Sequence, residues 1–88
     1  MLLGRRKRRI TTVLVVEDEP LVAFDTEHHL GDEGFKIVAT VDRVSDALDV
    51  ISRIESLDLV LVDLNLADGL GTDVARVAKA MEIPVLFV

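Results

Sequence analysis

The chain of 88 residues contains no cysteine, tryptophan or tyrosine, and phenylalanine occurs only three times. Without cysteine it cannot form disulfides, zinc–thiolate centres or thiol nucleophiles. The scarcity of aromatic rings weighs against binding of single-stranded nucleic acid, whose bases stack on such rings. No apolar run approaches the roughly 20 residues that a membrane span needs. Half of the residues are hydrophobic, so we expect one soluble, cytoplasmic domain with an aliphatic core and no membrane contact.

The charge is unevenly distributed along the chain. Five of the ten basic residues lie at positions 5–9, whereas residues 10–88 carry five basic and sixteen acidic side chains, a net charge of −11. A body this acidic predicts no direct binding to nucleic acid, whose phosphates need cationic partners. The basic run could itself contact nucleic acid or an anionic membrane. We favour a disordered, solvated leader at residues 1–9, followed by a domain at residues 10–88, because no amphipathic or aromatic pattern accompanies the run.

Short β-branched apolar runs alternate with helical periodicity from residue 10 onward. Such runs are typical of strands buried on both faces of a parallel sheet, and the alternation predicts an α/β fold: a doubly wound parallel sheet with helices on both faces. Along the first helix Leu21, Phe24 and His28 recur at helical spacing, and Leu30 is an optional further member of this set. One of His28 and His29 is expected to be partly packed. We predict strands at residues 10–16, 35–41, 58–62 and 84–88, helices at 20–33, 44–54 and 72–81, and a loop at 64–71.

The helix starts and the inner face of the last helix can also be predicted. Asp42 or Ser45 stands where a side chain could cap the second helix. In the third helix an apolar face is expected to point inward, formed by Val74, Val77, Ala78 and Met81.

Acidic side chains stand at the ends of two predicted strands. Glu17 and Asp18 follow the first strand and Asp63 follows the third. In an open parallel sheet, ligands bind beyond the carboxyl ends of the strands where strand order reverses. If these two strands are neighbours, three carboxylates converge, and a hard divalent cation such as Mg²⁺ would offset their repulsion. The alternative is that Asp18 and Glu19 only cap the following helix.

These segments resemble a known family. The runs at residues 13–20 (VLVVEDEP), 58–66 (DLVLVDLNL) and 68–71 (DGLG) are similar, in order and spacing, to the receiver domain of bacterial two-component response regulators, which has a flavodoxin-like fold. The resemblance implies that Asp63 is the phosphoacceptor. It further implies a Mg²⁺ site in which Asp18 is a direct ligand, Glu17 acts mainly through water, and Asn65 offers its backbone carbonyl.

The same resemblance implies how the domain would work. The phosphoryl donor would be a phosphohistidine on a sensor histidine kinase or a histidine phosphotransfer protein. The receiver would catalyse only its own phosphorylation, so it would be a signalling domain rather than a metabolic enzyme. An aspartyl-phosphate hydrolase is disfavoured, because that class places its nucleophile in an Asp-x-Asp pattern after the first strand, where this chain has Glu17-Asp18-Glu19.

The chain also departs from the family pattern. The family places a Thr or Ser after the fourth strand and a Lys after the fifth, and both positions fall beyond Val88, as do the fourth helix, fifth strand and fifth helix. Ala67 replaces a common Pro, which we expect to loosen that loop. We therefore expect self-association through the incomplete sheet, whose last strand would be a bare edge and whose first helix would be uncovered on one side. The alternative function is a pseudo-receiver that pairs with proteins without being phosphorylated.

Overall fold

The computed structural model describes residues 10–88, so the predicted basic leader at residues 1–9 lies outside the described part. No helix in that part is long and apolar enough to span a membrane. The elements follow in the order β1 (Thr12–Val16), α1 (Pro20–Asp32), β2 (Lys36–Val41), α2 (Val44–Arg53), β3 (Leu59–Val62), β4 (Asn65–Leu66), β5 (Gly69–Leu70), α3 (Gly71–Ala80) and β6 (Val85–Phe87).

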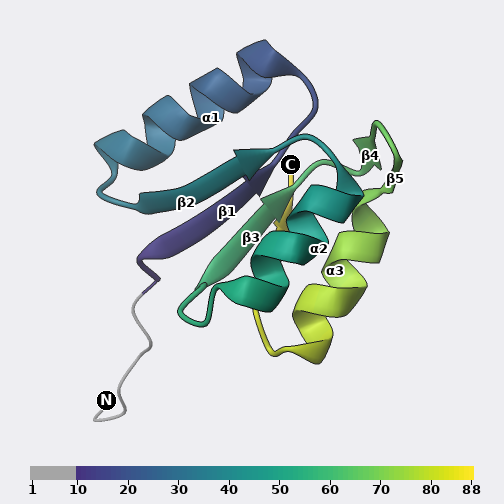
Figure 1. Ribbon diagram of the computed structural model, residues 1–88. Helices are drawn as coiled ribbons and strands as arrows, with labels where there is room; N and C mark the ends of the chain where they lie inside the picture. Colours follow the sequence, from purple (N-terminus) through teal and green to yellow (C-terminus); the bar gives the residue numbers. More distant parts are fainter. Residues whose placement is uncertain (1–9) are drawn as a thin grey trace, which may run out of the picture.

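Four strands form one parallel sheet in the order β2-β1-β3-β6. Helix α1 covers one face, and α2 and α3 lie side by side on the other (Figure 1). The predicted doubly wound α/β fold is therefore confirmed, including the adjacency of β1 and β3 on which the site depends. Strand order reverses at β1, because the chain moves outward to β2 and then returns across β1 to β3.

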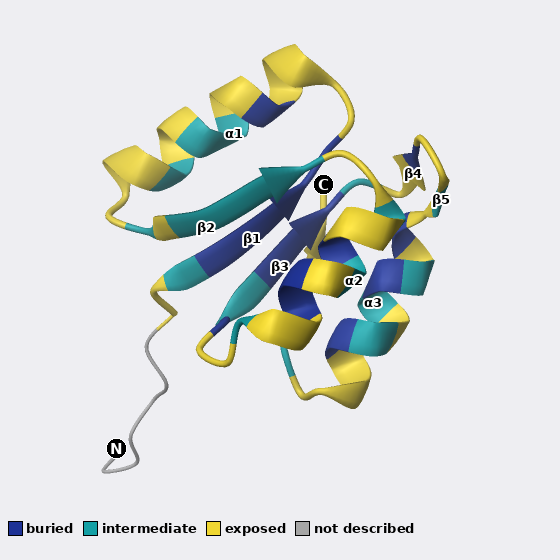
Figure 2. Ribbon diagram, in the orientation of Figure 1, coloured by how far each residue is buried: buried dark blue, intermediate teal, exposed yellow. Residues whose placement is uncertain are grey.

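The two central strands, β1 and β3, are buried on both faces, because their alternate side chains point in opposite directions toward helices that cover each side. Leu14 and Val16 point toward α2 and α3, and Val13 and Val15 point toward α1. All four are at most 2% exposed. Figure 2 shows this dark central band in β1 and β3, flanked by helices whose outer faces are exposed. An aliphatic core therefore holds the strand ends of β1 and β3 in register.

The orientation predicted for α1 is wrong. Ala23 is the buried residue of this helix, whereas Leu21 and Phe24 are 80% and 68% exposed. Neither His28 nor His29 is packed; each faces an aspartate one turn away, Asp32 and Asp25 respectively. Ala23 and Leu30 lie seven residues apart and therefore on one face of the helix, and Leu30 packs against the core. With that face toward the sheet, Leu21 and Phe24 point away from it.

The segment between β3 and α3 also differs from the prediction. Instead of an irregular loop over residues 64–71, the chain forms a short antiparallel hairpin in which Asn65 pairs with Leu70 and Leu66 with Gly69. Leu66 is 8% exposed and joins the core under α2 and α3, which anchors the hairpin.

The structure differs from the prediction in two details of the helices. Neither Asp42 nor Ser45 caps α2; its N-cap position is Arg43, which makes no side-chain cap bond. In α3, Val74 and Ala78 are buried as predicted, but Met81 lies just beyond the helix and is 50% exposed. Met81 leaves the inner face because the chain turns there toward β6.

Candidate functional site

The carboxyl ends of β1 and β3 bring together the three carboxylates selected from the sequence. Ligand atoms of Glu17, Asp18 and Asp63 all lie within 4.8 Å of one another. Among residues 10–88 this is the one group of three or more potential metal-ligating side chains so close together. Backbone hydrogen bonds continue the sheet up to the site: the Asp63 N–H donates to the Val16 carbonyl at 3.0 Å, and the Glu17 N–H donates to the Val41 carbonyl at 2.9 Å.

The three carboxylates differ in exposure. Glu17 is buried at 7% exposed, Asp63 is half-buried and Asp18 is exposed. Burial raises the pKa of the Glu17 carboxyl, and the neighbouring Asp63 and Asp18 raise it further. A hydrogen bond that the Glu19 N–H donates to Glu17 Oε2, 3.1 Å long, partly offsets this rise. The raised pKa records the cost of crowding negative charge in a poorly solvated place.

This arrangement fits a divalent metal ion. Mg²⁺ favours one or two carboxylates together with other oxygen ligands and water, and the cluster offers carboxylates of graded solvent access. The capping alternative has little support, because the Glu19 side chain makes no cap bond to α1. Instead it is Glu17 that accepts a backbone N–H at that helix start. The chemistry of the donor set therefore agrees with a cation held between β1 and β3.

Asn65 differs from the three carboxylates because its predicted metal ligand is a backbone carbonyl and not a side chain. It begins β4, two residues after Asp63, and is exposed. The role predicted for it involves the backbone carbonyl, so the position of the hairpin rather than the asparagine side chain would decide whether it can bind metal.

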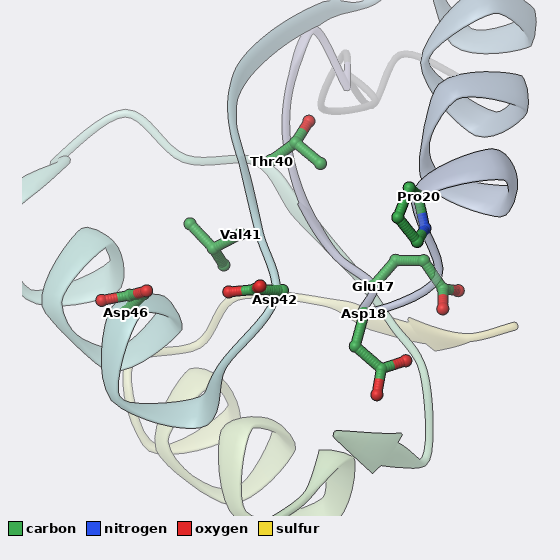
Figure 3. Close-up of a pocket in the computed structure, with 7 residues that line it drawn as sticks. All are labelled: Glu17, Asp18, Pro20, Thr40, Val41, Asp42 and Asp46. Atoms are coloured by element: carbon green, nitrogen blue, oxygen red, sulfur yellow. The ribbon is translucent and has the colours of Figure 1, made fainter. Parts of the chain in front are cut away.

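A cavity of about 350 Å³ adjoins the cluster on the side of β2. Its lining includes Glu17 and Asp18 but not Asp63. Figure 3 shows Asp42 and Asp46 on the opposite side of this cavity from Glu17 and Asp18. The cavity beside the candidate metal ligands is thus lined by acidic side chains on both sides, which favours cations over small anions.

Two residues make contacts at the site that the sequence does not indicate. Gly71 packs against the phosphoacceptor candidate: a Cβ there would lie 2.1 Å from the Asp63 carbonyl oxygen. The Asp68 carboxylate accepts backbone hydrogen bonds from the start of α2. The sequence places both residues in the predicted loop at 64–71 and in the run at 68–71 that resembles the receiver family, and no local pattern indicates their distant contacts.

Comparison with known proteins identifies the group to which the chain is related. A family model described as the response regulator receiver domain matches residues 13–88. The chain belongs to this family. Receiver domains are signalling domains of two-component systems, and this receiver domain keeps their flavodoxin-like fold over the described elements.

Two curated relatives are similar in sequence. The receiver domain is 34% identical over 80 residues to the phyllosphere-induced regulator PhyR of Methylorubrum extorquens. It is 38% identical over 71 residues to the cell cycle transcriptional regulator CtrA of Caulobacter vibrioides. These alignments cover 89% and 81% of this chain but 30% of each relative. The chain therefore spans about a third of the length of the curated relatives that it matches.

Solved structures of response regulators are similar to this chain in fold. The MaeR response regulator bound to beryllium trifluoride superposes with a TM-score of 0.79 at 30% identity, covering 89% of this chain and 66% of that one. The response regulator PhyR from Brucella abortus superposes with a TM-score of 0.80 at 32% identity, covering 92% of this chain and 34% of that one.

Proposed function

We propose that this receiver domain accepts a phosphoryl group from a phosphohistidine donor onto Asp63, in a reaction that requires Mg²⁺. The observation that carries the proposal is the convergence of three carboxylates within 4.8 Å at the ends of β1 and β3. Membership of the receiver family supports it. Asp63 is half-buried at the end of a strand whose preceding residues are buried, so its carboxylate is fixed in place yet open to a donor.

Each residue has a distinct role in the proposed metal site. Asp18, the exposed carboxylate, would be a direct ligand together with Asp63. Glu17, the buried one, would act mainly through ordered water, and Asn65 would offer its backbone carbonyl. Bound Mg²⁺ would offset the negative charge on the phosphoryl oxygens as the donor approaches. Without the ion, the approach of a phosphoryl group to three clustered carboxylates is opposed by like charge.

The transfer itself uses one nucleophile. A carboxylate oxygen of Asp63 attacks phosphorus, an oxygen–phosphorus bond forms, and the phosphorus–nitrogen bond of the phosphohistidine breaks. The bonding electrons leave with the imidazole, which takes up a proton. The product is an acyl phosphate on the chain itself, so the domain is a signalling module and turns over no separate substrate. The donor would be a sensor histidine kinase or a histidine phosphotransfer protein, and the domain would act in the cytoplasm.

A small phosphoryl donor provides the test of this function. We would incubate the chain with acetyl phosphate and Mg²⁺ and measure its intact mass, with EDTA and Asp63→Asn as controls. We expect one phosphoryl increment on the wild type with Mg²⁺ and none in either control. An increment of equal size on a folded Asp63→Asn chain would show that the acceptor lies elsewhere.

The metal site can be tested separately. Replacing Asp18 with asparagine removes a charged ligand, so we expect the Mg²⁺ affinity measured by calorimetric titration to fall by about tenfold or more. Asp25→Asn is the matched control, because it removes the same charge from an exposed position on α1. Equal loss of affinity in both variants would indicate a general charge effect, and unchanged affinity in Asp18→Asn would mean that Asp18 is not a ligand.

A second candidate function is protein pairing without phosphorylation. Strand β6 is an edge of the sheet, and Leu86 and Phe87 on it are 54% and 45% exposed. Exposed apolar edges favour association with another chain. The PhyR of Bartonella quintana has been solved in complex with the anti-sigma factor NepR, which supports a protein partner as the output of this candidate function. Light scattering at tens of micromolar would reveal self-association, which Leu86→Glu should abolish; a monodisperse wild-type monomer would argue against self-pairing.

A further inference from the structure

The carboxylate of Asp68 joins two elements that are distant in the sequence. It lies in the turn of the hairpin between β4 and β5 and accepts two backbone hydrogen bonds from the start of α2. The Val44 N–H donates to Oδ1 at 2.6 Å, and the Ser45 N–H donates to Oδ2 at 3.2 Å. The helix makes no side-chain cap bond from its own N-cap residue, Arg43. Asp68 therefore caps α2 from 24 positions further along the chain.

Both hydrogen bonds join an N–H group at the start of a helix to an ionised carboxylate. The first N–H groups of a helix have no partner within the helix, and the helix dipole favours an anion beside them. A hydrogen bond to an ionised carboxylate is stronger than one between neutral groups. Accordingly the bond from Val44, with that from Ser45, lowers the pKa of the Asp68 carboxyl. Asp68 thus stays ionised and bound to α2 near neutral pH.

The hairpin that Asp68 holds continues directly from the phosphoacceptor strand. The Gly71 N–H donates to the Leu64 carbonyl at 2.6 Å, which closes the base of the hairpin one residue after Asp63. Gly69 lies against α2 as well, because a Cβ added there would meet Val44 Cγ2 at 3.1 Å. The hairpin from Asn65 to Leu70 is therefore held at two places. The bond between Gly71 and Leu64 closes its base, and Asp68 ties its turn to α2.

We propose that Asp68 is a positioning residue for the metal site, fixing the hairpin against α2 so that the backbone carbonyl of Asn65 is held in place for Mg²⁺. This inference rests on the proposed function. Asp68 touches neither metal nor phosphoryl group in this scheme; it acts through the hairpin backbone. Without its two hydrogen bonds the turn between Leu66 and Gly69 is free to move. The backbone carbonyl of Asn65, one residue before that turn, is then no longer held in place.

Three substitutions at this position separate positioning from charge. Asp68→Ala removes both bonds, and we expect Mg²⁺ affinity in calorimetric titration to fall by about tenfold, as for other residues that orient metal ligands. Asp68→Asn keeps a capping oxygen, so affinity should recover to within about threefold of the wild type. Asp68→Glu keeps the charge but displaces the carboxylate by one methylene, so it should bind Mg²⁺ more weakly than Asp68→Asn.

Asp58→Ala is the matched control. The Asp58 carboxylate also accepts two backbone hydrogen bonds, from Thr11 and Thr12 at 2.9 and 3.0 Å, but at the amino end of β3, opposite Asp63. This variant should lose stability while keeping the wild-type Mg²⁺ affinity.

Each outcome of the titrations has a defined meaning. Wild-type affinity in Asp68→Ala overturns the inference, and so does an affinity loss of the same size in Asp58→Ala. If Asp68→Ala does not fold, the order of the other two variants decides, and tighter binding by Asp68→Glu than by Asp68→Asn overturns positioning in favour of charge. A wild-type chain that binds no Mg²⁺ overturns the proposed metal site itself, which distinguishes that failure from the failure of this inference.

Discussion

Replacing Gly71 with alanine tests how closely the start of α3 is held against Asp63, at the end of β3. An added Cβ would lie 2.1 Å from the Asp63 carbonyl oxygen and 3.1 Å from the Leu64 Cα. Both are backbone atoms, so no side-chain rotation can relieve the contact. The Cβ and the oxygen must separate by roughly 1 Å or more to reach an ordinary van der Waals distance, and Asp63 must shift or α3 must move away.

Two opposing effects set the size of the change. Alanine in a helix interior is favoured over glycine by about 0.5–1 kcal/mol, and Gly71, as the first residue of α3, would gain at most that much. Gly71 does not have a positive φ that would oppose alanine. Overpacking a close-packed site costs about 1–3 kcal/mol. The clash is the larger effect, so we expect the free energy of unfolding to fall by about 1–2 kcal/mol. For a domain of this size that lowers the Tm by roughly 4–8 °C per kcal/mol.

Urea unfolding of two glycine variants measures this effect. Gly31→Ala is the matched control, because it lies within α1 and an added Cβ there meets nothing within 4 Å. Gly31→Ala should be unchanged or more stable by up to about 1 kcal/mol, whereas Gly71→Ala should be less stable and should bind Mg²⁺ more weakly. Equal stability of the two variants would refute the close contact between α3 and Asp63.

Three further predictions concern stability. Glu82 adopts a φ of 61° just after α3, a conformation that costs a non-glycine residue about 1–2 kcal/mol. Glu82→Gly should therefore raise the Tm in thermal melts, and a lower Tm would contradict the backbone strain. The raised pKa of Glu17 means that, in EDTA, the contribution of this residue to stability is fully present below its ordinary pKa of 4.5 and is lost as the pH rises through the raised pKa. The difference in urea midpoint between the wild type and Glu17→Gln should therefore change over that range in this direction, and a difference that does not vary with pH would contradict the shift. Ile51, on the inner face of α2, is 1% exposed, so Ile51→Ala should cost about 2–5 kcal/mol in urea unfolding. A cost below about 1 kcal/mol would mean that the neighbouring side chains close the cavity.

The features that could be predicted from the sequence are those carried by local patterns. The apolar run ending at Val16 and the run ending at Val62 predicted buried parallel strands, and both are confirmed. Acidic residues directly after these runs predicted a cluster, because the carboxyl ends of adjacent parallel strands meet. Glu17, Asp18 and Asp63 are indeed within reach of one another, while their roles in metal binding and phosphoryl transfer stay predictions.

The features that could not be predicted depend on contacts between distant residues. Asp68 caps a helix that starts 24 positions earlier, and no local signal distinguishes such a cap from an ordinary turn aspartate. Gly71 is required by the nearness of Asp63, which depends on how α3 docks. Periodicity in α1 identified a helix but not its inner face, since Ala23 rather than the larger Phe24 packs on the sheet.

The most direct test of the account is to locate the phosphoryl group chemically. After incubation with acetyl phosphate and Mg²⁺, borohydride reduction converts an aspartyl phosphate into homoserine, which peptide sequencing by mass spectrometry detects. The account predicts homoserine at position 63 and at no other acidic position, and only when Mg²⁺ is present. Homoserine at position 18, or a chain that binds Mg²⁺ yet contains no homoserine, would contradict the assignment of Asp63 as the phosphoacceptor.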